Sequence, residues 1–446
     1  MGRLFGTDGI RGLANQHPIT PEMGLKLGRA VVQFCERKGY RPKVVIGRDT
    51  RESGEMLENA VVSGVNSAGG DAFRVGVLPT PGVAYLTREL GGGTGMVISA
   101  SHNPHDYNGF KIFSHQGFKL SDNEEMEIED LIYSTGSLLP HRVTGEVQIL
   151  VDAGERYVTF LRTTLPESFD LEGMCIVLDC ANGATCKAAP VLFERLGAEI
   201  ETLSVDPDGQ NINRDCGSQH TEVLRQKVME AGADMGLAFD GDGDRLIAVD
   251  ETGKVLTGDQ ILTICAKMLK EKGELKSNVV ISTVMSNMGF PLALNDFGID
   301  YAYTKVGDRY VTEEMRARNA NLGGEESGHI IFLDHQTTGD GLLSALYLSS
   351  AIVWFEQPLS ELSALMKVFP QTVLNIPVKT KPEISTVPQL VKVIEMVEGE
   401  LSKKGRVLVR YSGTEPVCRI MVEGERQAEI DEYARQIGDV IRDQLG

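Results

Sequence analysis

Three aspartates stand at alternate positions in the stretch DGDGDR: Asp240, Asp242 and Asp244. Carboxylates this close repel one another, and the glycines between them let the backbone turn so that all three face one point. A hard divalent cation relieves that repulsion, and Mg²⁺ with oxygen ligands fits best. A calcium-binding EF-hand loop is disfavoured, because Arg245 stands where its sixth position requires glycine. The stretch therefore predicts a magnesium site, with a solvated hairpin turn as the alternative.

A serine stands directly before a histidine at the end of a short apolar run in ISASHNPHDYNGFKIF. By itself Ser101 is typical of a helix cap or a turn. The predicted metal site makes it a candidate nucleophile, because Mg²⁺ neutralises the charge on a transferring phosphoryl group. His102 could orient the serine or its phosphate. Lys111 could hold an anion or move a proton, or it could be a solvated strand lysine. Ser99 is expected to be buried.

Three further loops carry polar side chains between glycines. GGEESGH presents Glu325 and Ser327, which suit sugar hydroxyls or an amine. FGTDGIRG places Arg11 where it could meet a substrate or the phosphate on the serine. RYSGTEP combines a guanidinium, hydroxyls and exposed amides, which together suit a phosphate; the candidate phosphate ligands are Arg410, Ser412, Gly413, Thr414 and Arg419. Each loop alone could be an ordinary turn, so the prediction depends on their combination.

The elements that must position these loops recur three times along the chain. Each unit opens with a β-branched strand (KVVIGRD, CIVLDCANG or NVVISTVMSN), followed by a stretch of helical length and a second strand. A third strand then leads into the polar loop, and a short alternating strand (FKIF, RLIAV or HIIFL) follows it. This order predicts three similar α/β domains with mixed, mostly parallel sheets and helices on both faces. Ligands bind such sheets at the carboxyl ends of strands, where all three loops fall.

The pattern changes near Gln371 to strand, helix, two strands and a final helix, which predicts a smaller α+β domain. We expect the four domains to surround a central cleft, with a hinge around Pro370 and Gln371 that opens and closes it. The predicted domains, each with one loop, are 1–150 with the serine, 151–255 with the metal ligands, 256–370 with the sugar loop and 371–446 with the phosphate loop.

The composition limits the class of protein. The 446 residues include 44 Lys and Arg against 63 Asp and Glu, a net charge of −19, which argues against nucleic acid or an anionic membrane as the main partner. The first residues, MGRLFGTDGIRG, lack the apolar region of a signal peptide, and the chain has no apolar run of about 18 residues. The seven scattered cysteines form no C-x-x-C pair, which suggests neither a disulfide framework nor a zinc site. A cytoplasmic location is expected.

The four loops in this order, SASHNP, DGDGDR, GEESGH and RYSGTEP, resemble those of the α-D-phosphohexomutase superfamily over essentially the whole chain. The resemblance implies that Ser101 is carried as a phosphoserine, whose phosphate binds one Mg²⁺ together with Asp240, Asp242 and Asp244. It also implies that the serine gives its phosphoryl group to a hexose 6-phosphate. The serine then takes the other phosphoryl group back from the 1,6-bisphosphate and leaves a hexose 1-phosphate.

The same resemblance implies roles for the remaining loop residues. Glu325 and Ser327 would accept the sugar in two orientations, while the fourth loop holds the phosphate that is not reacting. Arg245 and Arg309 are candidate anion contacts. The sequence does not rank the candidates for general acid and base, which are Lys111, His102 and Arg11.

Within the superfamily, FGTDGIRG, TKVGDRYV and RYSGTEPVCRIMVEGE indicate the bacterial branch that converts glucosamine 6-phosphate into glucosamine 1-phosphate for UDP-N-acetylglucosamine and cell-wall synthesis. Glucosamine 1,6-bisphosphate is then the expected activator. Glu326 stands where that branch usually has glutamine, so a phosphomannomutase or phosphoglucomutase stays open. A Mg²⁺-dependent phosphatase that uses Ser101 covalently and an inactive sugar-phosphate sensor stay open as well. The resemblance further implies a homodimer through the first domain and a kinase or bisphosphate that primes Ser101.

Overall fold

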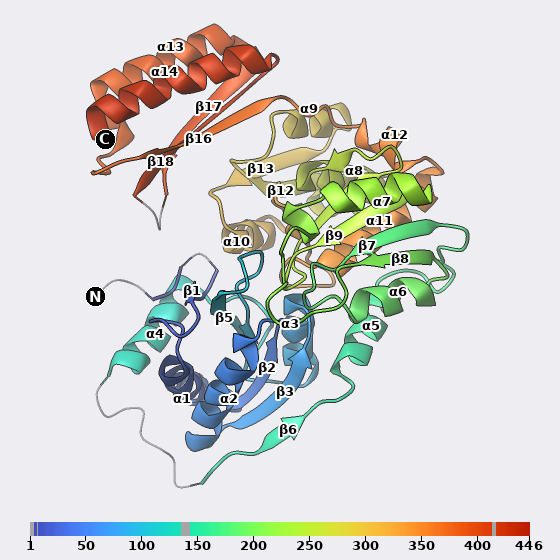
Figure 1. Ribbon diagram of the computed structural model, residues 1–446, viewed down its shortest axis with the longest axis vertical. Coiled ribbons are helices and arrows are strands. Elements are labelled where there is room, and N and C mark those ends of the chain that lie inside the picture. The colour runs from blue at the N-terminus through green and yellow to red at the C-terminus, as the bar shows by residue number, and fades with distance from the viewer. Residues whose placement is uncertain (1–3, 7, 135–142, 413–415) are drawn as a thin grey trace. The chain divides into compact units, whose positions relative to one another are not determined.

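A computed structural model of the chain describes residues 4–6, 8–134, 143–412 and 416–446 (Figure 1). The chain divides into two compact units, Met1–Met285 with Ile299–Leu365 and Ser286–Gly298 with Met366–Gly446. Three sheets lie in the first unit and a fourth lies in the second.

The first three sheets share one strand order, β3-β2-β4-β5, β8-β7-β9-β10 and β13-β12-β14-β15. In each sheet the first three of these strands run parallel and the fourth is antiparallel. The predicted threefold repeat and its mixed, mostly parallel sheets are therefore confirmed. The strands are β2 Lys43–Arg48, β3 Asp71–Val77, β4 Thr94–Ile98, β5 Tyr107–Ser114, β7 Cys175–Asp179, β8 Glu199–Leu203, β9 Met235–Phe239, β10 Leu246–Asp250, β12 Val279–Thr283, β13 Asp300–Thr304, β14 Leu322–Gly324 and β15 Ile330–Phe332.

Short edge strands extend two of these sheets. In the first sheet β1 (Ile10–Leu13) pairs with β5 and β6 (Val147–Ile149) pairs with β3. In the second sheet β11 (Val255–Leu256) pairs with β10. The pairing of β1 with β5 brings the FGTDGIRG loop beside the strand that carries Lys111.

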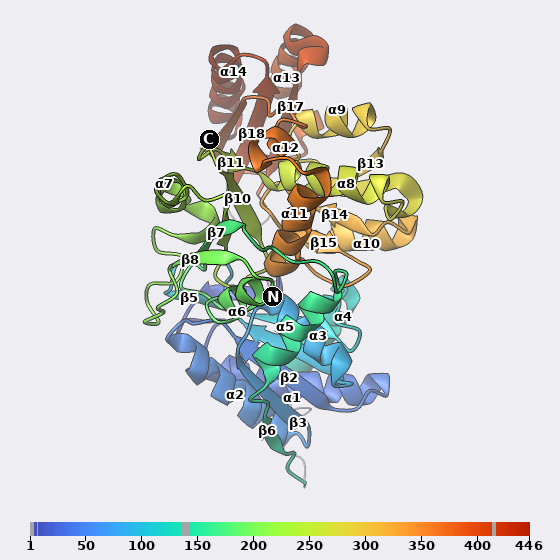
Figure 2. The ribbon, with the colours of Figure 1, turned by 90° about the vertical axis from the view of Figure 1, so that its right-hand side faces the viewer.

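The first sheet is covered by helices on both faces (Figures 1 and 2). Side chains of β2 alternate between the faces, as they do in any strand. Val44 and Ile46 pack into a core with α1 (Pro21–Lys38) and α2 (Ser53–Ser67). Gly47 lies instead against Val83 of the opposite layer. That layer contains α3 (Thr80–Glu89) and α5 (Ala153–Thr163), while α4 (Asp122–Tyr133) packs on α1.

The second and third sheets carry cores of the same kind. Val177 of β7 packs with apolar residues of α7 (Glu222–Ala231), and α6 (Ala188–Arg195) lies beside β8. Ile281 of β12 packs with α10 (Asp308–Arg318). The helices α8 (Gly258–Glu271) and α11 (Gly341–Phe355) pack against each other, and α12 (Leu359–Ser363) follows them.

The second unit is built on an antiparallel sheet in the order β16-β18-β17, formed by Gln371–Pro377, Val417–Gly424 and Gly405–Tyr411. The helices α13 (Pro388–Leu401) and α14 (Gln427–Leu445) share its core. The helix α9 (Gly289–Asp296) lies within the range predicted for the third domain and packs with this unit. The buried carboxylate of Glu423 explains this, because it accepts hydrogen bonds from Asn287 Nδ2 (3.1 Å) and the Met288 amide (3.2 Å).

The chain passes between the units three times, after Met285, Gly298 and Leu365. The linker predicted at Pro370 and Gln371 lies a few residues after the last of these passages, where the Pro370 carbonyl accepts a hydrogen bond from the Gly424 amide of β18. Its role as a hinge stays a prediction.

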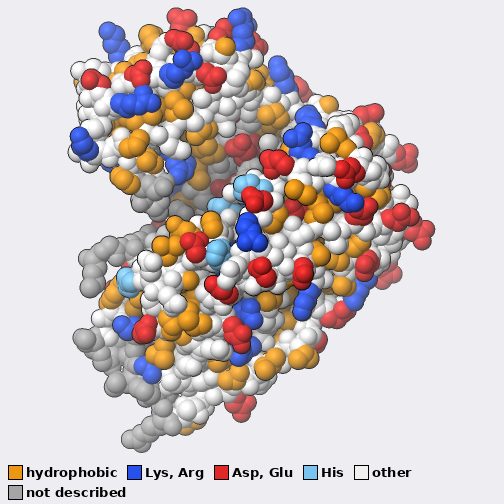
Figure 3. Space-filling view, in the orientation of Figure 1, with side chains coloured by type: hydrophobic (Ala, Val, Ile, Leu, Met, Phe, Trp, Pro, Cys, Tyr) orange, Lys and Arg blue, Asp and Glu red, His pale blue; other side chains and the backbone are white. Residues whose placement is uncertain are grey.

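On the surface viewed in Figure 3, acidic and basic side chains are interspersed with apolar ones. Among the described residues, no helix combines the length and the apolar character needed to cross a membrane.

Candidate active site

The serine loop and the metal loop follow the carboxyl ends of β4 and β9 in the first and second sheets. Ser101 lies three residues after Ile98, and Asp240 follows Phe239 directly. Although they are 139 residues apart in the chain, Ser101 Oγ donates a hydrogen bond of 2.6 Å to Asp240 Oδ2. The structure thus brings the candidate nucleophile to the candidate metal ligands.

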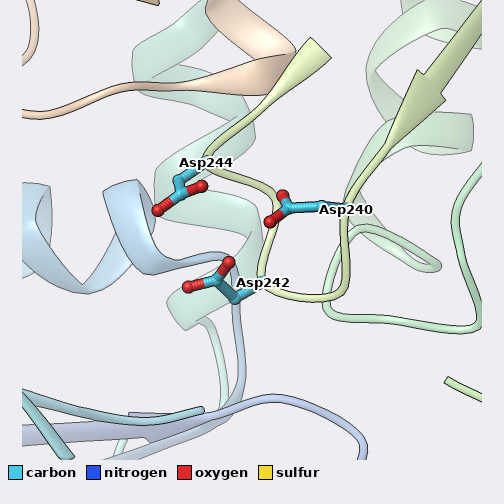
Figure 4. Close-up of side chains that lie close together, drawn as sticks. All are labelled: Asp240, Asp242 and Asp244. Carbon is cyan, nitrogen blue, oxygen red and sulfur yellow. The ribbon is translucent and has the colours of Figure 1, made fainter. Parts of the chain in front are cut away.

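The three aspartates of DGDGDR lie on the loop between β9 and β10, and their carboxylates gather around a common space (Figure 4). All three are buried, and one carboxylate oxygen from each lies within 4.8 Å of those from the other two. Burial and the two neighbouring carboxylates raise the pKa of Asp240 well above its usual range. Within the described residues, the buried Asp242 Oδ1 has no hydrogen-bond partner. This set of crowded oxygen donors fits a hard divalent cation.

Lys111 on β5 is buried among carboxylates. Its Nζ lies 2.6 Å from Asp242 Oδ2 and 3.1 Å from both Asp244 Oδ2 and Asp8 Oδ2. Burial alone would lower the pKa of Lys111, but the three carboxylates raise it well above its usual range. Lys111 is therefore a protonated part of the site, and the alternative of a solvated strand lysine is wrong.

Sequence reasoning missed an ion-pair ring that continues from Lys111. Asp8 also pairs with Lys119, whose Nζ lies 2.5 Å from Asp308 Oδ2. The carboxylate of Asp308 in turn lies 3.2 Å from His329 Nε2. Asp8, Asp308 and His329 stand in stretches that carry the resemblance to the superfamily, FGTDGIRG, TKVGDRYV and GEESGH, whereas Lys119 carries no such signal.

His329 closes this ring because its Nδ1 lies 3.6 Å from Asp244 Oδ1. Burial lowers the pKa of His329, but Asp244 and Asp308 outweigh it and raise the pKa to about 10. The Gly339 amide also lies 2.9 Å from Nε2 and would need a lone pair there. Two flanking carboxylates favour the charged ring over that single neutral donor, so His329 adds a positive charge opposite Lys111.

Arg11 and His102 flank the serine from the first domain. Arg11 pairs with Asp8, and its Nη1 lies 3.3 Å from Asn103 Oδ1. The Nδ1 atom of His102 lies 3.2 Å from Ser101 Oγ. Burial, followed by the charges of Arg245 and Arg11, lowers the pKa of His102 to about 3. His102 is therefore a neutral imidazole beside the serine at physiological pH.

The predicted sugar loop joins this cluster through its backbone and through Arg245. The Glu325 amide donates to the His329 carbonyl at 2.9 Å, and Glu325 Oε1 accepts from the Gly307 amide at 3.1 Å. Burial raises the pKa of Glu325. Among the described residues, the buried Ser327 Oγ has no hydrogen-bond partner. The Arg245 amide donates to Asp240 Oδ1 at 3.2 Å, which ties the arginine to the metal loop.

Arg309 is engaged away from the other sugar-loop residues. Its Nη1 lies 2.5 Å from Asp122 Oδ1, and its Nη2 pairs with Glu125, both on α4. These ion pairs hold the third domain to the first within one unit. A contact between Arg309 and a substrate anion stays a prediction.

The predicted phosphate loop lies in the second unit. Arg410 on β17 pairs in register with Arg419 on β18, which brings two guanidinium groups together. Burial and the Arg419 charge lower the pKa of Arg410. Ser412 is buried, while Gly413 and Thr414 lie outside the described residues. Adjacent cations of this kind suit a doubly charged phosphate.

Comparisons with known proteins agree with this architecture. Family models of phosphoglucomutase/phosphomannomutase match α/β/α domain I at residues 2–138, domain II at 155–253, domain III at 257–369 and the C-terminal domain at 373–440. Proteins named phosphoglucosamine mutase from Syntrophus aciditrophicus and Geobacillus kaustophilus are 55% and 51% identical to this chain, and each alignment covers 100% of both chains.

Two solved structures show the same fold. A phosphoglucomutase/phosphomannomutase family protein from Burkholderia thailandensis has a TM-score of 0.82 at 24% identity, covering 100% of this chain and 98% of its own. The N-acetylphosphoglucosamine mutase of Aspergillus fumigatus, solved with GlcNAc-6P and magnesium, has a TM-score of 0.70 at 15% identity, covering 99% and 96%. With four domain models matched in order and full-length relatives above 50% identity, the chain belongs to the phosphoglucomutase/phosphomannomutase family of α-D-phosphohexomutases.

Proposed function

We propose that the chain is a phosphoglucosamine mutase, which interconverts glucosamine 6-phosphate and glucosamine 1-phosphate through a phosphoserine at Ser101. The observation that carries this proposal is the hydrogen bond of 2.6 Å between Ser101 Oγ and Asp240 in the buried aspartate cluster. Acyl transfer by a serine relies on a Ser-His-Asp triad, in which the carboxylate orients the histidine. The carboxylate beside Ser101 belongs instead to the predicted divalent-cation site, which suits phosphoryl transfer. The choice of amino sugar is supported by the names of the full-length relatives.

Asp240, Asp242 and Asp244 would hold Mg²⁺, which when bound neutralises charge on the transferring phosphoryl group. In the first transfer the bond from Ser101 Oγ to phosphorus breaks, and a bond from the sugar O1 to phosphorus forms. The product is glucosamine 1,6-bisphosphate, which reorients within the site before the second transfer. Ser101 Oγ then takes the phosphoryl group from the 6-position, so the phosphoserine is restored and glucosamine 1-phosphate leaves.

The charge states of the site bear on the acid and base candidates. Neighbouring carboxylates raise the pKa of Arg11 and of Lys111, so both side chains stay protonated and supply positive charge beside the transferring phosphoryl group, while the raised pKa makes each a weaker proton donor. The lowered pKa of His102 keeps its ring neutral, so its Nδ1 can hydrogen-bond the serine hydroxyl but is a weak base for an attacking hydroxyl. Each transfer needs one proton acceptor and one proton donor, because the attacking hydroxyl loses a proton and the leaving oxygen gains one in the same step.

The other loops would bind the sugar and its second phosphate. Glu325 and Ser327 offer an acceptor and a hydroxyl to the sugar, and Arg410 with Arg419 and Ser412 would hold the phosphate that is not reacting. Arg245 would meet an anion near the metal loop. The first turnover needs a phosphoserine, so priming of Ser101 by glucosamine 1,6-bisphosphate or by a kinase is part of the proposal. A homodimer and a cytoplasmic location stay predictions.

A coupled assay with glucosamine 1-phosphate, glucose 1-phosphate and mannose 1-phosphate tests the substrate. The proposal expects the highest kcat/KM for the amino sugar, dependence on Mg²⁺ and on a 1,6-bisphosphate, and no release of inorganic phosphate in proportion to turnover. Preference for a neutral sugar would assign a phosphoglucomutase or phosphomannomutase instead. Phosphate released in proportion to turnover would assign a phosphatase.

Substitution of the serine tests the phosphoryl carrier. Ser101→Ala should lose turnover by several powers of ten while it still binds the phosphosugar, because only the transferring group is removed. Intact mass should show one phosphate on the wild type that phosphatase removes, and none on the variant. An active Ser101→Ala enzyme would refute the mechanism.

A further inference from the structure

The backbone of Ser101 has a conformation that its surroundings must impose. Its φ is +52°, in the left-handed region that residues other than glycine seldom adopt. Such conformations persist where neighbouring groups hold the chain in place. The peptide groups on both sides of Ser101 are held in this way by side chains outside the metal cluster.

The amide on the N-terminal side is fixed through Ser99. The Ser101 N–H donates to Ser99 Oγ at 2.9 Å, and Ser99 Oγ donates to Asp49 Oδ2 at 2.6 Å. All three residues are buried. The expectation that Ser99 is buried is confirmed, and its hydroxyl links the serine loop to the carboxylate that follows β2.

The carbonyl on the C-terminal side is held by two donors. The Ser101 carbonyl oxygen accepts from Arg51 Nη2 at 2.9 Å and from Asn213 Nδ2 at 2.8 Å. The Asn103 carbonyl oxygen accepts from the same two nitrogens, at 2.8 Å and 3.0 Å. Two side chains therefore bridge the same pair of carbonyls, and we call this arrangement the carbonyl clamp.

Arg51 is itself rigidly placed. Its side chain is fully buried, and its Nε donates to Asp49 Oδ2 at 2.9 Å. Its Nη1 donates to the Pro104 and Tyr107 carbonyls. A buried guanidinium whose donors are all used can impose the geometry of the loop around it, because moving the loop would leave donors unpaired.

The second half of the carbonyl clamp comes from another domain. Asn213 lies in the second domain, which also carries the metal loop, and its own φ of +57° suits asparagine. Next to Asp240, Gly241 lies so close to the serine loop that an added Cβ would come 2.6 Å from the Ser101 carbonyl oxygen. The clamp thus docks the serine loop of the first domain on the metal loop of the second.

We propose that Arg51 and Asn213 are positioning residues for phosphoryl transfer, which hold Ser101 Oγ in line with the aspartate cluster by clamping the two carbonyls of its loop. This inference rests on the proposed function. A loosened clamp would let the serine and its phosphate shift relative to the metal ligands. Among the described residues of the first unit, the donors to the clamp carbonyls are Arg51 and Asn213 and do not include the sugar loop, so the loss should fall on kcat and leave KM in place.

The decisive variant is Asn213→Gly, because glycine keeps the left-handed backbone and removes both hydrogen bonds. Its matched control is Asn66→Gly, since Asn66 Nδ2 also bridges two carbonyls, of Gly70 at 3.1 Å and Glu146 at 3.0 Å, far from the serine loop in the chain. Both variants and the wild type are first phosphorylated with glucosamine 1,6-bisphosphate. The coupled assay and thermal unfolding are then run on all three.

Asn213→Gly should lower kcat by about 10²-fold with little change in KM, whereas Asn66→Gly should keep the kcat of the wild type even though a glycine within α2 lowers its thermal stability. Arg51→Lys should recover part of the kcat that Arg51→Met loses, because an ammonium can still donate to one or both carbonyls. If the Arg51 variants do not fold, the comparison of Asn213→Gly with Asn66→Gly still tests the inference.

Unchanged kcat in Asn213→Gly, or a change confined to KM, would overturn the inference while leaving the proposed function intact. Equal losses of kcat in Asn213→Gly and Asn66→Gly would also overturn it, since they would show a general structural effect. A wild type that turns over none of the three sugar phosphates and carries no phosphoserine would refute the proposed function, and the role of the clamp in phosphoryl transfer with it.

Discussion

Replacing Lys111 by methionine tests whether its ammonium stabilises the aspartate cluster in the absence of metal. Methionine keeps an apolar stem of similar length and removes only the charge. The ammonium lies 2.6 to 3.1 Å from three carboxylates, of which Asp242 and Asp244 are buried and Asp8 is partly exposed. Breaking a buried ion pair by removing one partner costs about 3–5 kcal/mol, because the other charge is left uncompensated. Lys111→Met should therefore lose about 3–5 kcal/mol of stability in metal-free buffer.

Magnesium should restore part of this loss. A cation bound only to the folded chain stabilises it by about 2.7 kcal/mol at a hundred times its dissociation constant. Removal of the ammonium leaves a more negative cluster, so the variant should bind Mg²⁺ more tightly and gain more stability from it than the wild type does. Urea unfolding with chelator and over a Mg²⁺ titration measures both quantities.

Lys38→Met is the matched control for this experiment. Lys38 Nζ lies 2.7 Å from Glu127, about the same distance as in the buried pair, but both side chains are about one-third or more exposed. Solvent screening limits such a pair to about 0–1 kcal/mol, with no dependence on Mg²⁺. Equal losses for Lys111→Met and Lys38→Met, or an unchanged response of Lys111→Met to Mg²⁺, would refute the role of Lys111 in charge balance.

Three further predictions address other parts of the molecule. Burial raises the pKa of Asp340 to about 6. Between about pH 4 and 6 the folded chain therefore keeps a proton on Asp340 that the unfolded chain has released. The free energy of unfolding should fall by about 3 kcal/mol as the pH rises across that window. Asp340→Asn should remove this slope in urea unfolding, and an identical slope in the variant would contradict the assignment. Gly241→Ala should slow phosphorylation of Ser101 by bisphosphate, followed by intact mass, because its methyl group would meet the Ser101 carbonyl; an unchanged rate would argue against the close docking of the two loops. Arg309→Gln should lose about 3–5 kcal/mol of stability by removing the ion pair between Arg309 and the buried Glu125, with KM unchanged, whereas a raised KM at unchanged stability would favour the anion contact expected from the sequence.

The threefold strand order could be predicted because the signals for each strand lie within a short stretch of sequence. Each strand is marked by β-branched residues and each connection by its length and a glycine, and these signals act over a few residues. The placement of α9 could not be predicted in this way. Its position depends on Glu423, which lies more than 130 residues further along the chain and accepts hydrogen bonds from Asn287 and Met288.

The site shows the same division between local and distant signals. The spacing of Asp240, Asp242 and Asp244 and the polar loops after each third strand indicated phosphoryl chemistry before any contact was known. Lys119 gave no signal, because a lysine in the segment that follows a strand is usually solvated. Only its burial between Asp8 and Asp308 makes it part of the site.

The sequence by itself therefore determined the order of the elements, the residue types at their ends and the kind of chemistry that those residues can do. Only the tertiary structure decided which charges are paired and which side chains hold Ser101 in place. The physical reason is that hydrogen bonds and ion pairs between residues 50 to 140 positions apart depend on distance and burial. Neither quantity is encoded in a local pattern of residues.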